Sequence, residues 1–291
     1  MTLQAHVYPA GTVAGARPAQ PLMARAAVSQ STAPLPSPRG DYPHPQGLRL
    51  VESQRIEAGP WFSGLPPQLR QAILAKARVQ HVKRGTRLLQ RGDAASHWVG
   101  VASGALGLAT SWRDGRAFTL ELLGPGDWYG DIALIDGSAV DLDIVAQTHS
   151  TVLMVSSDAL QQLLRDEPEL RHALLQLDCR RLRHIFRQLE ELQTMPLAQR
   201  VALKLERLLR QFGRAPAYGA TPGSARLIEL SLTQGDLAGL LCASRQRING
   251  VLRQLQGLGI LGSSHGRIEV LQPPRLADVA QGRLVLATGG G

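Results

Sequence analysis

The sequence has little cysteine, very little lysine and no long apolar run. Two cysteines, Cys179 and Cys242, are too few for a disulfide scaffold or for the four thiolates of an iron–sulfur cluster. This scarcity fits the reducing cytoplasm, where we expect the protein to work. No apolar run reaches the roughly 18 residues of a membrane span, and the N-terminus lacks the pattern of a secretion signal. We expect neither a membrane partner nor export.

Motifs for enzyme chemistry are also missing. The sequence has no His-x-His pair with a downstream carboxylate and histidine, which is the metal set of a cupin-like enzyme. No Ser/His/Asp set and no glycine-rich phosphate motif stands out. We therefore expect no catalytic residue, no metal and no cofactor, and a cupin-like enzyme is the contrary reading.

The net charge of the 291-residue chain is +9, which indicates nucleic acid or another anionic partner. Only three of the 32 basic residues are lysine, namely Lys76, Lys83 and Lys204. Because codon composition alone can produce such an arginine bias, the location of the charge matters more than its total. Residues 47–166 and 167–195 are each neutral, whereas residues 196–272 carry +6. The last of these segments is the candidate nucleic-acid binder.

Composition and periodicity divide the chain into five segments. Residues 1–46 hold eight of the 18 prolines and show no periodicity, which predicts a disordered tail. In residues 47–166, short alternating runs separated by glycines predict a small closed β-structure. Residues 167–195 and 196–272 have helical periods, and residues 273–291 are expected to form a loose C-terminal tail.

Residues 167–195 predict one long helix with an apolar stripe that only Asp178 interrupts. Its a and d positions are Leu175, Leu182, Ile185, Leu189 and Leu192. Such a heptad pattern favours pairing with a second helix, here from another copy of the chain. The alternative is a helix packed on its own β-domain. Pro196 ends the helix, because proline has no amide donor and clashes with the preceding turn.

The basic segment contains the pattern of a helix-turn-helix. Thr233 is a plausible N-cap for a first helix, and Ser244 is one for a second helix. A short break at Cys242-Ala243 separates them, although glycine is commoner than cysteine at such a turn. Leucine, isoleucine and valine recur on one side of both helices, as the crossing of the two requires.

The exposed side of the second helix has the chemistry for reading DNA. Arginine can bind guanine through two hydrogen bonds, and glutamine or asparagine can bind adenine in the same way. A strand pair follows the helices and resembles a wing, with His265 and Arg267 near its tip, where they could meet phosphate. The candidate DNA-binding residues are Thr233, Gln234, Ser244, Arg245, Gln246, Arg247, Asn249, Arg253 and Arg267.

The order of these segments resembles the Crp/Fnr family of bacterial transcription regulators. The likeness covers roughly residues 60–272 and is carried by the glycine-spaced stretch 84–137, by GDWYGDIALIDG (126–137), by LTQGDLA (232–238) and by SRQRINGVLRQL (244–255). It implies an α+β fold with an N-terminal double-stranded β-helix of the cyclic-nucleotide-binding type. A long dimerisation helix and a C-terminal winged helix-turn-helix would follow.

The nucleotide cassette of that family is altered here. Nucleotide-binding members hold the ribose with a Gly-Glu pair and the cyclic phosphate with an Arg-Ser pair. Gly130-Asp131 stands at the first pair and Asp141-Leu142 at the second, with Asp143 as a further carboxylate. Carboxylates would repel a phosphate, which needs donors and positive charge. The helix positions that would meet the base are the apolar Ile185 and Phe186. Cyclic AMP is therefore not the expected effector.

The sequence thus predicts a cytoplasmic, homodimeric regulator that binds a near-palindromic site in double-stranded DNA. RNA polymerase would be a further partner of an activator. The effector is open: a ligand other than a cyclic phosphate, a protein partner or no effector. The alternative function is a sensor of a cyclic nucleotide or of another small ligand, whose DNA binding strictly requires that ligand.

Overall fold

The computed structural model describes residues 45–111, 117–213, 225–228, 230, 232–264 and 267–286. The tail predicted for residues 1–46 lies almost entirely outside them, and so do His265 and residues 287–291. None of the helices in the described ranges is both long and apolar enough to cross a membrane.

The first half of the chain is a roll of short strands with helices at its ends. Helices α1 (Leu50–Glu57) and α2 (Pro67–Lys76) enclose the 3-10 helix η1 (Phe62–Gly64). The strands are β1 (Arg78–Val82), β2 (Arg87–Leu89), β3 (His97–Ser103), β4 (Leu106–Ser111), β5 (Ala117–Leu123), β6 (Trp128–Tyr129), β7 (Asp143–Ala146) and β8 (Ser150–Ser156). Helix α3 (Asp131–Asp136) separates β6 from β7.

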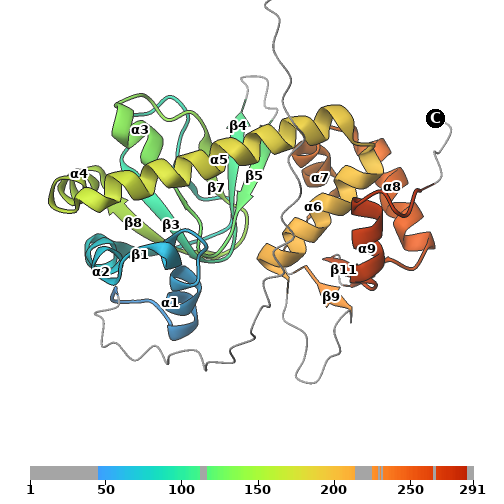
Figure 1. Ribbon diagram of the computed structural model, residues 1–291, viewed down its shortest axis with the longest axis horizontal. Coiled ribbons are helices and arrows are strands. Elements are labelled where there is room, and N and C mark those ends of the chain that lie inside the picture. Colours follow the sequence, from blue (N-terminus) through green and yellow to red (C-terminus); the bar gives the residue numbers. More distant parts are fainter. Residues whose placement is uncertain are drawn as a thin grey trace, which may run out of the picture. The chain divides into compact units, whose positions relative to one another are not determined.

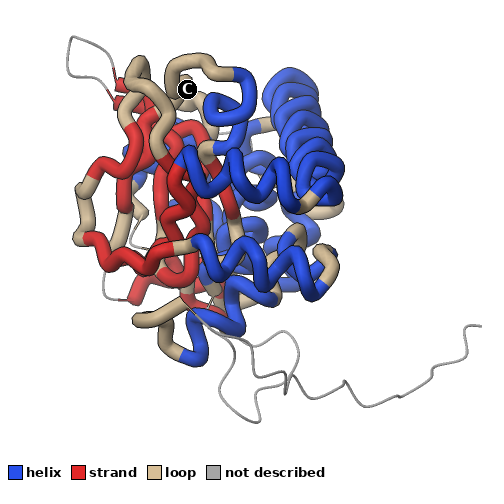
Figure 2. Tube along the Cα trace, turned by 90° about the vertical axis from the view of Figure 1, so that its left-hand side faces the viewer, coloured by secondary structure: helices blue, strands red, loops and turns tan. Residues whose placement is uncertain are grey.

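The strands pair into two antiparallel four-stranded sheets, in the orders β1-β8-β3-β6 and β2-β7-β4-β5. An apolar cluster with side chains from both sheets fills the space between them, among them Val99, Leu106, Ile144 and Val152. The double-stranded roll predicted from the glycine-spaced strands is confirmed. Figure 2 shows the strands of the roll in red with blue helices packed beside them.

Strands β3 and β8 are buried on both faces, although alternation alone predicted one buried face for each strand. Their outer face packs against α1 and α4 (Ser157–Asp166). A second apolar cluster lies on this outer face and contains Trp61, Phe62, Trp98 and Trp128. The rings of Trp98 and Trp128 are 4.4 Å apart, and Trp61 Nε1 donates a hydrogen bond of 2.9 Å to the carbonyl of Ala173. Aromatic packing therefore anchors the start of the long helix to the roll.

Helix α5 (Pro168–Thr194) spans 27 residues and runs from the roll toward the second half of the chain (Figure 1). Its first turns are buried against the roll through Leu170, Ala173 and Leu174. Only Met195 and Pro196 separate α5 from α6 (Leu197–Phe212), as the proline predicted.

The second half holds a helix-turn-helix and a small sheet. Helices α7 (Gln234–Leu240) and α8 (Arg245–Gly257) pack on α6, and strands β9 (Arg226–Leu227), β10 (Leu261–Ser264) and β11 (Arg267–Val270) form a sheet in the order β10-β11-β9. The predicted winged helix-turn-helix is confirmed.

The prediction of a loose tail over residues 273–291 is wrong for the first part of that segment, which is helical. Helix α9 (Pro273–Ala280) packs against α6, and its Leu276 and Val279 are buried. Leu286 is also buried in the same core. The sequence stretch is short and flanked by proline and glycine, so the apolar contacts with α6, and not local pattern, decide that it is ordered.

We predict that Gly126→Ala destabilises the roll. Gly126 has φ of +92°, and a Cβ there would lie 2.7 Å from Gly59 Cα. The strained backbone and the clash should together lower the free energy of unfolding by about 2–4 kcal/mol. Thermal unfolding followed by circular dichroism measures this. Gly64→Ala is the control, because a Cβ at Gly64 meets no atom within 4 Å. Equal melting temperatures for the two variants would contradict the prediction.

Candidate functional site

The two helices of the DNA-binding motif begin at the predicted caps. The Thr233 hydroxyl accepts a hydrogen bond of 3.1 Å from the backbone of Asp236, whose carboxylate accepts one of 2.7 Å from the Thr233 amide. The Ser244 hydroxyl accepts one of 3.3 Å from the amide of Arg247. Both predicted N-caps are confirmed, and each fixes where its helix starts.

The backbone of the turn between the helices accounts for the preference for glycine at the position of Cys242. Cys242 has φ of +49°, the left-handed conformation in which glycine is commonest. The backbone returns through a hydrogen bond of 3.0 Å from the Ala243 amide to the Ala238 carbonyl. Arg200 of α6 donates a hydrogen bond of 2.8 Å to the Leu241 carbonyl at this turn. An arginine from a third helix therefore holds the bend, a contact that sequence reasoning missed.

The side of α8 that is predicted to contact DNA bases is exposed to solvent. Ile248, Leu252 and Leu255 are buried and leave the opposite side of α8 free. The exposed candidates are Thr233, Ser244, Arg245, Gln246, Arg247 and Arg253, and the half-buried ones are Gln234, Asn249 and Arg267. Because the first turn and a half of α8 presents two guanidinium groups and an amide, this surface has donors for base edges and phosphates.

Asn249 differs from its neighbours because its amide already has a partner. The side-chain amide of Gln234, the first residue of α7, donates a hydrogen bond of 3.1 Å to Asn249 Oδ1. Bidentate pairing with adenine uses both the oxygen and the nitrogen of an asparagine amide. One of them is engaged by Gln234, so the bond ties the two helices together. Among the described candidates on α8, Gln246 is the amide that is exposed to solvent.

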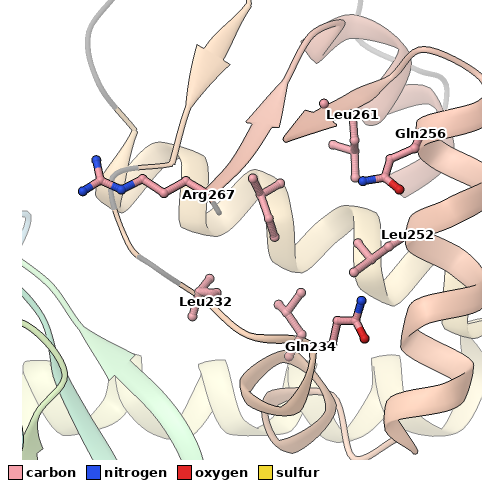
Figure 3. Close-up of a pocket in the computed structure, with 9 residues that line it drawn as sticks. Leu232, Gln234, Leu252, Gln256, Leu261 and Arg267 are labelled. Carbon is pink, nitrogen blue, oxygen red and sulfur yellow. The ribbon is translucent and has the colours of Figure 1, made fainter. Parts of the chain in front are cut away.

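A small cavity lies between α7, α8 and the wing (Figure 3). Its volume is about 140 Å³, and its walls are mainly leucines with Gln234 and Gln256 at the edge. Arg267 also borders it, but Figure 3 shows its guanidinium extending away from the other lining side chains. Arg267 lies at the start of β11, beside the wing tip, as predicted for a phosphate contact.

In the roll, Asp131 lies at the position predicted for an effector contact and is fully buried. Arg181 of α5 fills the space in front of it. Its Nη1 donates to both Asp131 oxygens, at 3.0 and 2.8 Å, and to Asp178 at 2.6 Å. Its Nη2 donates to the Trp128 carbonyl, and its guanidinium carbon is 5.1 Å from the centre of the Tyr129 ring. The carboxylate that would take a ribose hydroxyl is thus already in an ion pair.

The charges of this group depend on one another. Burial acts to lower the pKa of Arg181, but Asp131 and Asp178 outweigh it and raise that pKa. Burial, and then the charge of Asp131, raise the pKa of Asp178. The guanidinium therefore stays protonated, and it neutralises part of the negative charge next to the roll.

The positions predicted to face a cyclic phosphate hold a carboxylate and an apolar side chain. Asp141 is exposed, and Leu142 is half-buried against the inner cluster of the roll. Asp143 is the further carboxylate of this region. It is buried, and its Oδ1 accepts a hydrogen bond of 2.9 Å from the Arg91 amide, with Arg87 Nε at 4.0 Å.

Ile185 and Phe186, the positions expected to meet the base, are 50% and 58% exposed on α5. Arg181, one turn earlier, is the residue of α5 that reaches Asp131. The stripe positions Leu175, Leu182, Ile185, Leu189 and Leu192 are all between 40% and 61% exposed. Among the described residues, the protomer therefore leaves about half of the surface of these stripe side chains exposed to solvent.

Comparison with known proteins agrees with this architecture. A model of the cyclic nucleotide-binding domain family matches residues 79–167, and one of the Crp-like helix-turn-helix domain matches residues 199–279. The cyclic AMP receptor protein of Thermus thermophilus is 29% identical over 78% of this chain and 99% of its own length. A CRP-like cAMP-activated global transcriptional regulator of Mycobacterium tuberculosis is 26% identical over 76% and 96%.

This chain belongs to the Crp/Fnr family of transcription regulators. The structure of FixK2 from Bradyrhizobium japonicum shares the fold of this regulator, with a TM-score of 0.59 and 23% identity over 70% of this chain and 96% of that one. The recognition made from the motifs is confirmed, as is the α+β fold class that it implied.

Sequence reasoning missed the polar partners of α5 in this regulator. One signal was available, because Asp178 interrupts the heptad pattern and Arg181 follows three residues later, the spacing of an intrahelical ion pair. That spacing gives no hint of Asp131, which is 50 residues away and meets Arg181 only in the tertiary structure.

We predict that Arg181→Gln destabilises the protein by about 2–4 kcal/mol, because it leaves Asp131 buried without its cation. Asp131→Asn combined with Arg181→Gln should recover most of that loss, since both charges are then gone. Urea unfolding measures the free energies. Arg183→Gln, an exposed arginine of the same helix, is the control and should change stability by less than about 0.5 kcal/mol. A double variant as unstable as the single one would contradict the prediction.

Proposed function

We propose that this regulator works in the cytoplasm as a homodimer that binds a near-palindromic site in double-stranded DNA. Each α8 would enter the major groove of one half-site, the two being about one helical turn apart. The observation that carries the proposal is the open face of α8, where Arg245, Gln246 and Arg247 are exposed at the N-terminal end of a doubly capped motif. As an activator, it would also contact RNA polymerase.

The charge distribution supports DNA as the partner. The +6 of residues 196–272 includes the exposed arginines 245, 247 and 253 on α8. These residues supply the positive charge that a phosphate backbone attracts. Arg245 is the proposed reader of a guanine and Gln246 that of an adenine. Thr233, Ser244, Arg253 and Arg267 are proposed phosphate contacts.

The apolar stripe of α5 supports the homodimer. Burying apolar surface contributes about 25 cal/mol per Å², so leaving this stripe in water is unfavourable. Asp178, the polar member of the stripe, has Arg181 as an internal partner. Asp178 can therefore lie beside a partner helix with its negative charge paired to Arg181.

We propose that cyclic AMP is not the effector of this regulator. Its cyclic phosphate would meet Asp141 instead of an arginine, and its ribose would compete with Arg181 for the oxygens of Asp131. Regulation by another ligand, by a protein partner or without an effector is compatible with this arrangement.

The DNA function is tested by selecting bound sequences from random duplexes. We predict a two-fold-related motif, and we expect Arg245→Ala to relax one base preference and weaken specific binding by about 1–3 kcal/mol. Asn249→Ala should instead weaken binding to all sequences alike, because Asn249 braces α7. Recovery of a motif without two-fold symmetry, or of none, would refute the proposal.

The effector argument is tested by calorimetric titration of the purified regulator with cyclic AMP. We predict no binding in the micromolar range, because phosphate recognition needs donors and positive charge. Asp141→Arg restores a guanidinium at the phosphate position and should raise the affinity. Micromolar binding to the unaltered protein would show that Asp141 does not exclude the phosphate.

Self-association is tested by sedimentation of a stripe variant. Leu182→Lys would place two charges opposite one another in the proposed seam, so we predict that it converts the dimer to a monomer. Val285→Lys is the control, because Val285 is an exposed apolar residue outside α5. A monomeric unaltered protein, or equal dissociation of the two variants, would contradict the prediction.

A further inference from the structure

A polar junction joins the roll, the long helix and the DNA-binding half at one carboxylate. Glu121 of β5 accepts hydrogen bonds from Lys204 of α6 at 2.7 Å, from Gln188 of α5 at 2.6 Å and from the ring of His184, also of α5, at 3.1 Å. Two consecutive helices therefore meet a strand that lies at least 63 residues earlier in the sequence. We call this group the Glu121 junction.

Lys204 is a buried lysine in a chain that has few lysines. It is 5% exposed, whereas Lys76 and Lys83 are exposed. A buried ammonium is unfavourable unless it is paired and hydrogen-bonded. Glu121 supplies that partner: burial alone would raise its pKa, but the hydrogen bond from His184 and the charge of Lys204 outweigh burial and lower the pKa to about 2. Glu121 is therefore ionised at neutral pH.

The same face of α6 makes a second contact with the roll two turns further on. Gln211 donates a hydrogen bond of 2.7 Å to Asp127 and one of 3.4 Å to the Leu122 carbonyl. Seven residues of helix, about 10 Å, separate it from Lys204. Two contacts at that separation fix the direction of α6 as well as its position.

Apolar packing surrounds these polar contacts. Leu122 and Ala105 of the roll belong to the same buried cluster as Leu205 and Leu209 of α6, and α7 packs on β5. The link between α5 and α6 is only Met195-Pro196, whose extended backbone interrupts the helix. Because so short a break leaves the two helices free to swivel, non-covalent contacts must set the angle between them.

We propose that the ion pair between Glu121 and Lys204 fixes the orientation of the DNA-binding half and so determines which half-site spacing the dimer accepts. This inference rests on the proposed dimeric DNA binding. A rigid dimer reads two half-sites at one separation, and each inserted base pair moves the second site by about 3.4 Å and turns it by about 35°. A DNA-binding half whose orientation is not fixed could rotate and still reach the displaced half-site.

The first test measures affinity for duplexes whose two half-sites are moved apart by zero, one or two base pairs. The unaltered regulator should lose about tenfold or more per inserted pair, whereas Lys204→Met should vary by less than about threefold over the series. Affinity for a duplex with a single half-site should stay unchanged, which shows that α8 is folded. Lys83→Met, at an exposed lysine, is the matched control and should keep the steep profile.

A spacing profile in Lys204→Met as steep as that of the unaltered protein would overturn the proposal. If Lys204→Met loses single-site binding because it does not fold, Glu121→Gln combined with Lys204→Met takes its place, since it removes the whole ion pair and leaves no buried charge without a partner. The same flattening is expected, and a steep profile overturns the proposal for this variant too.

The second test needs no DNA and so separates this inference from the proposed function. Spin labels at Cys242 and at Ser138→Cys, in a Cys179→Ser background, report the distance between the DNA-binding half and the roll. Both positions are exposed. With unlabelled protein in excess, so that only distances within one chain are seen, the distribution should be narrow in the unaltered protein and broad with Lys204→Met. Equal widths would overturn the proposal even if DNA binding is confirmed.

Discussion

The structure depends on α5 having two different faces. One face carries polar side chains at helical spacing, and each binds a group of the same protomer: Arg181 binds Asp131, His184 and Gln188 bind Glu121, and Glu191 binds Arg207 of α6. The other face carries the exposed leucines and Ile185. Since these polar groups have partners within the chain, the apolar face is the one that the proposed second copy would cover.

The polar face of α5 also reaches Asp131, at the position in the roll where the family resemblance predicts an effector contact. The family position that takes a ribose is occupied by Asp131, and the nearest cation is supplied by the protein itself. A buried carboxylate is tolerable only with such a partner. Arg181 therefore links α3 and β6 of the roll to α5 through contacts within the chain.

Charge has three separate roles in the molecule. The arginines of α8 remain in solvent, where they suit a phosphate backbone, while Arg181 and Arg200 satisfy groups inside the protein. The compact ammonium of Lys204 lies at the Glu121 junction. The basic excess of residues 196–272 was correctly assigned to the DNA-binding segment, but one of its positive charges faces the roll and not the solvent.

Local pattern determined the parts of this protein that depend on near neighbours in the chain. Alternation and glycines predicted the roll, Thr233 and Ser244 fixed two helix starts, and Pro196 ended α5. Contacts between distant residues decided the rest. Asp143 turned toward Arg91, Asn249 toward Gln234, and α9 became ordered on α6. Glu121 and Lys204 are 83 positions apart, and no sequence period links them. Only the packing of β5 against α6 brings the two charges together, because burial makes each of them require the other.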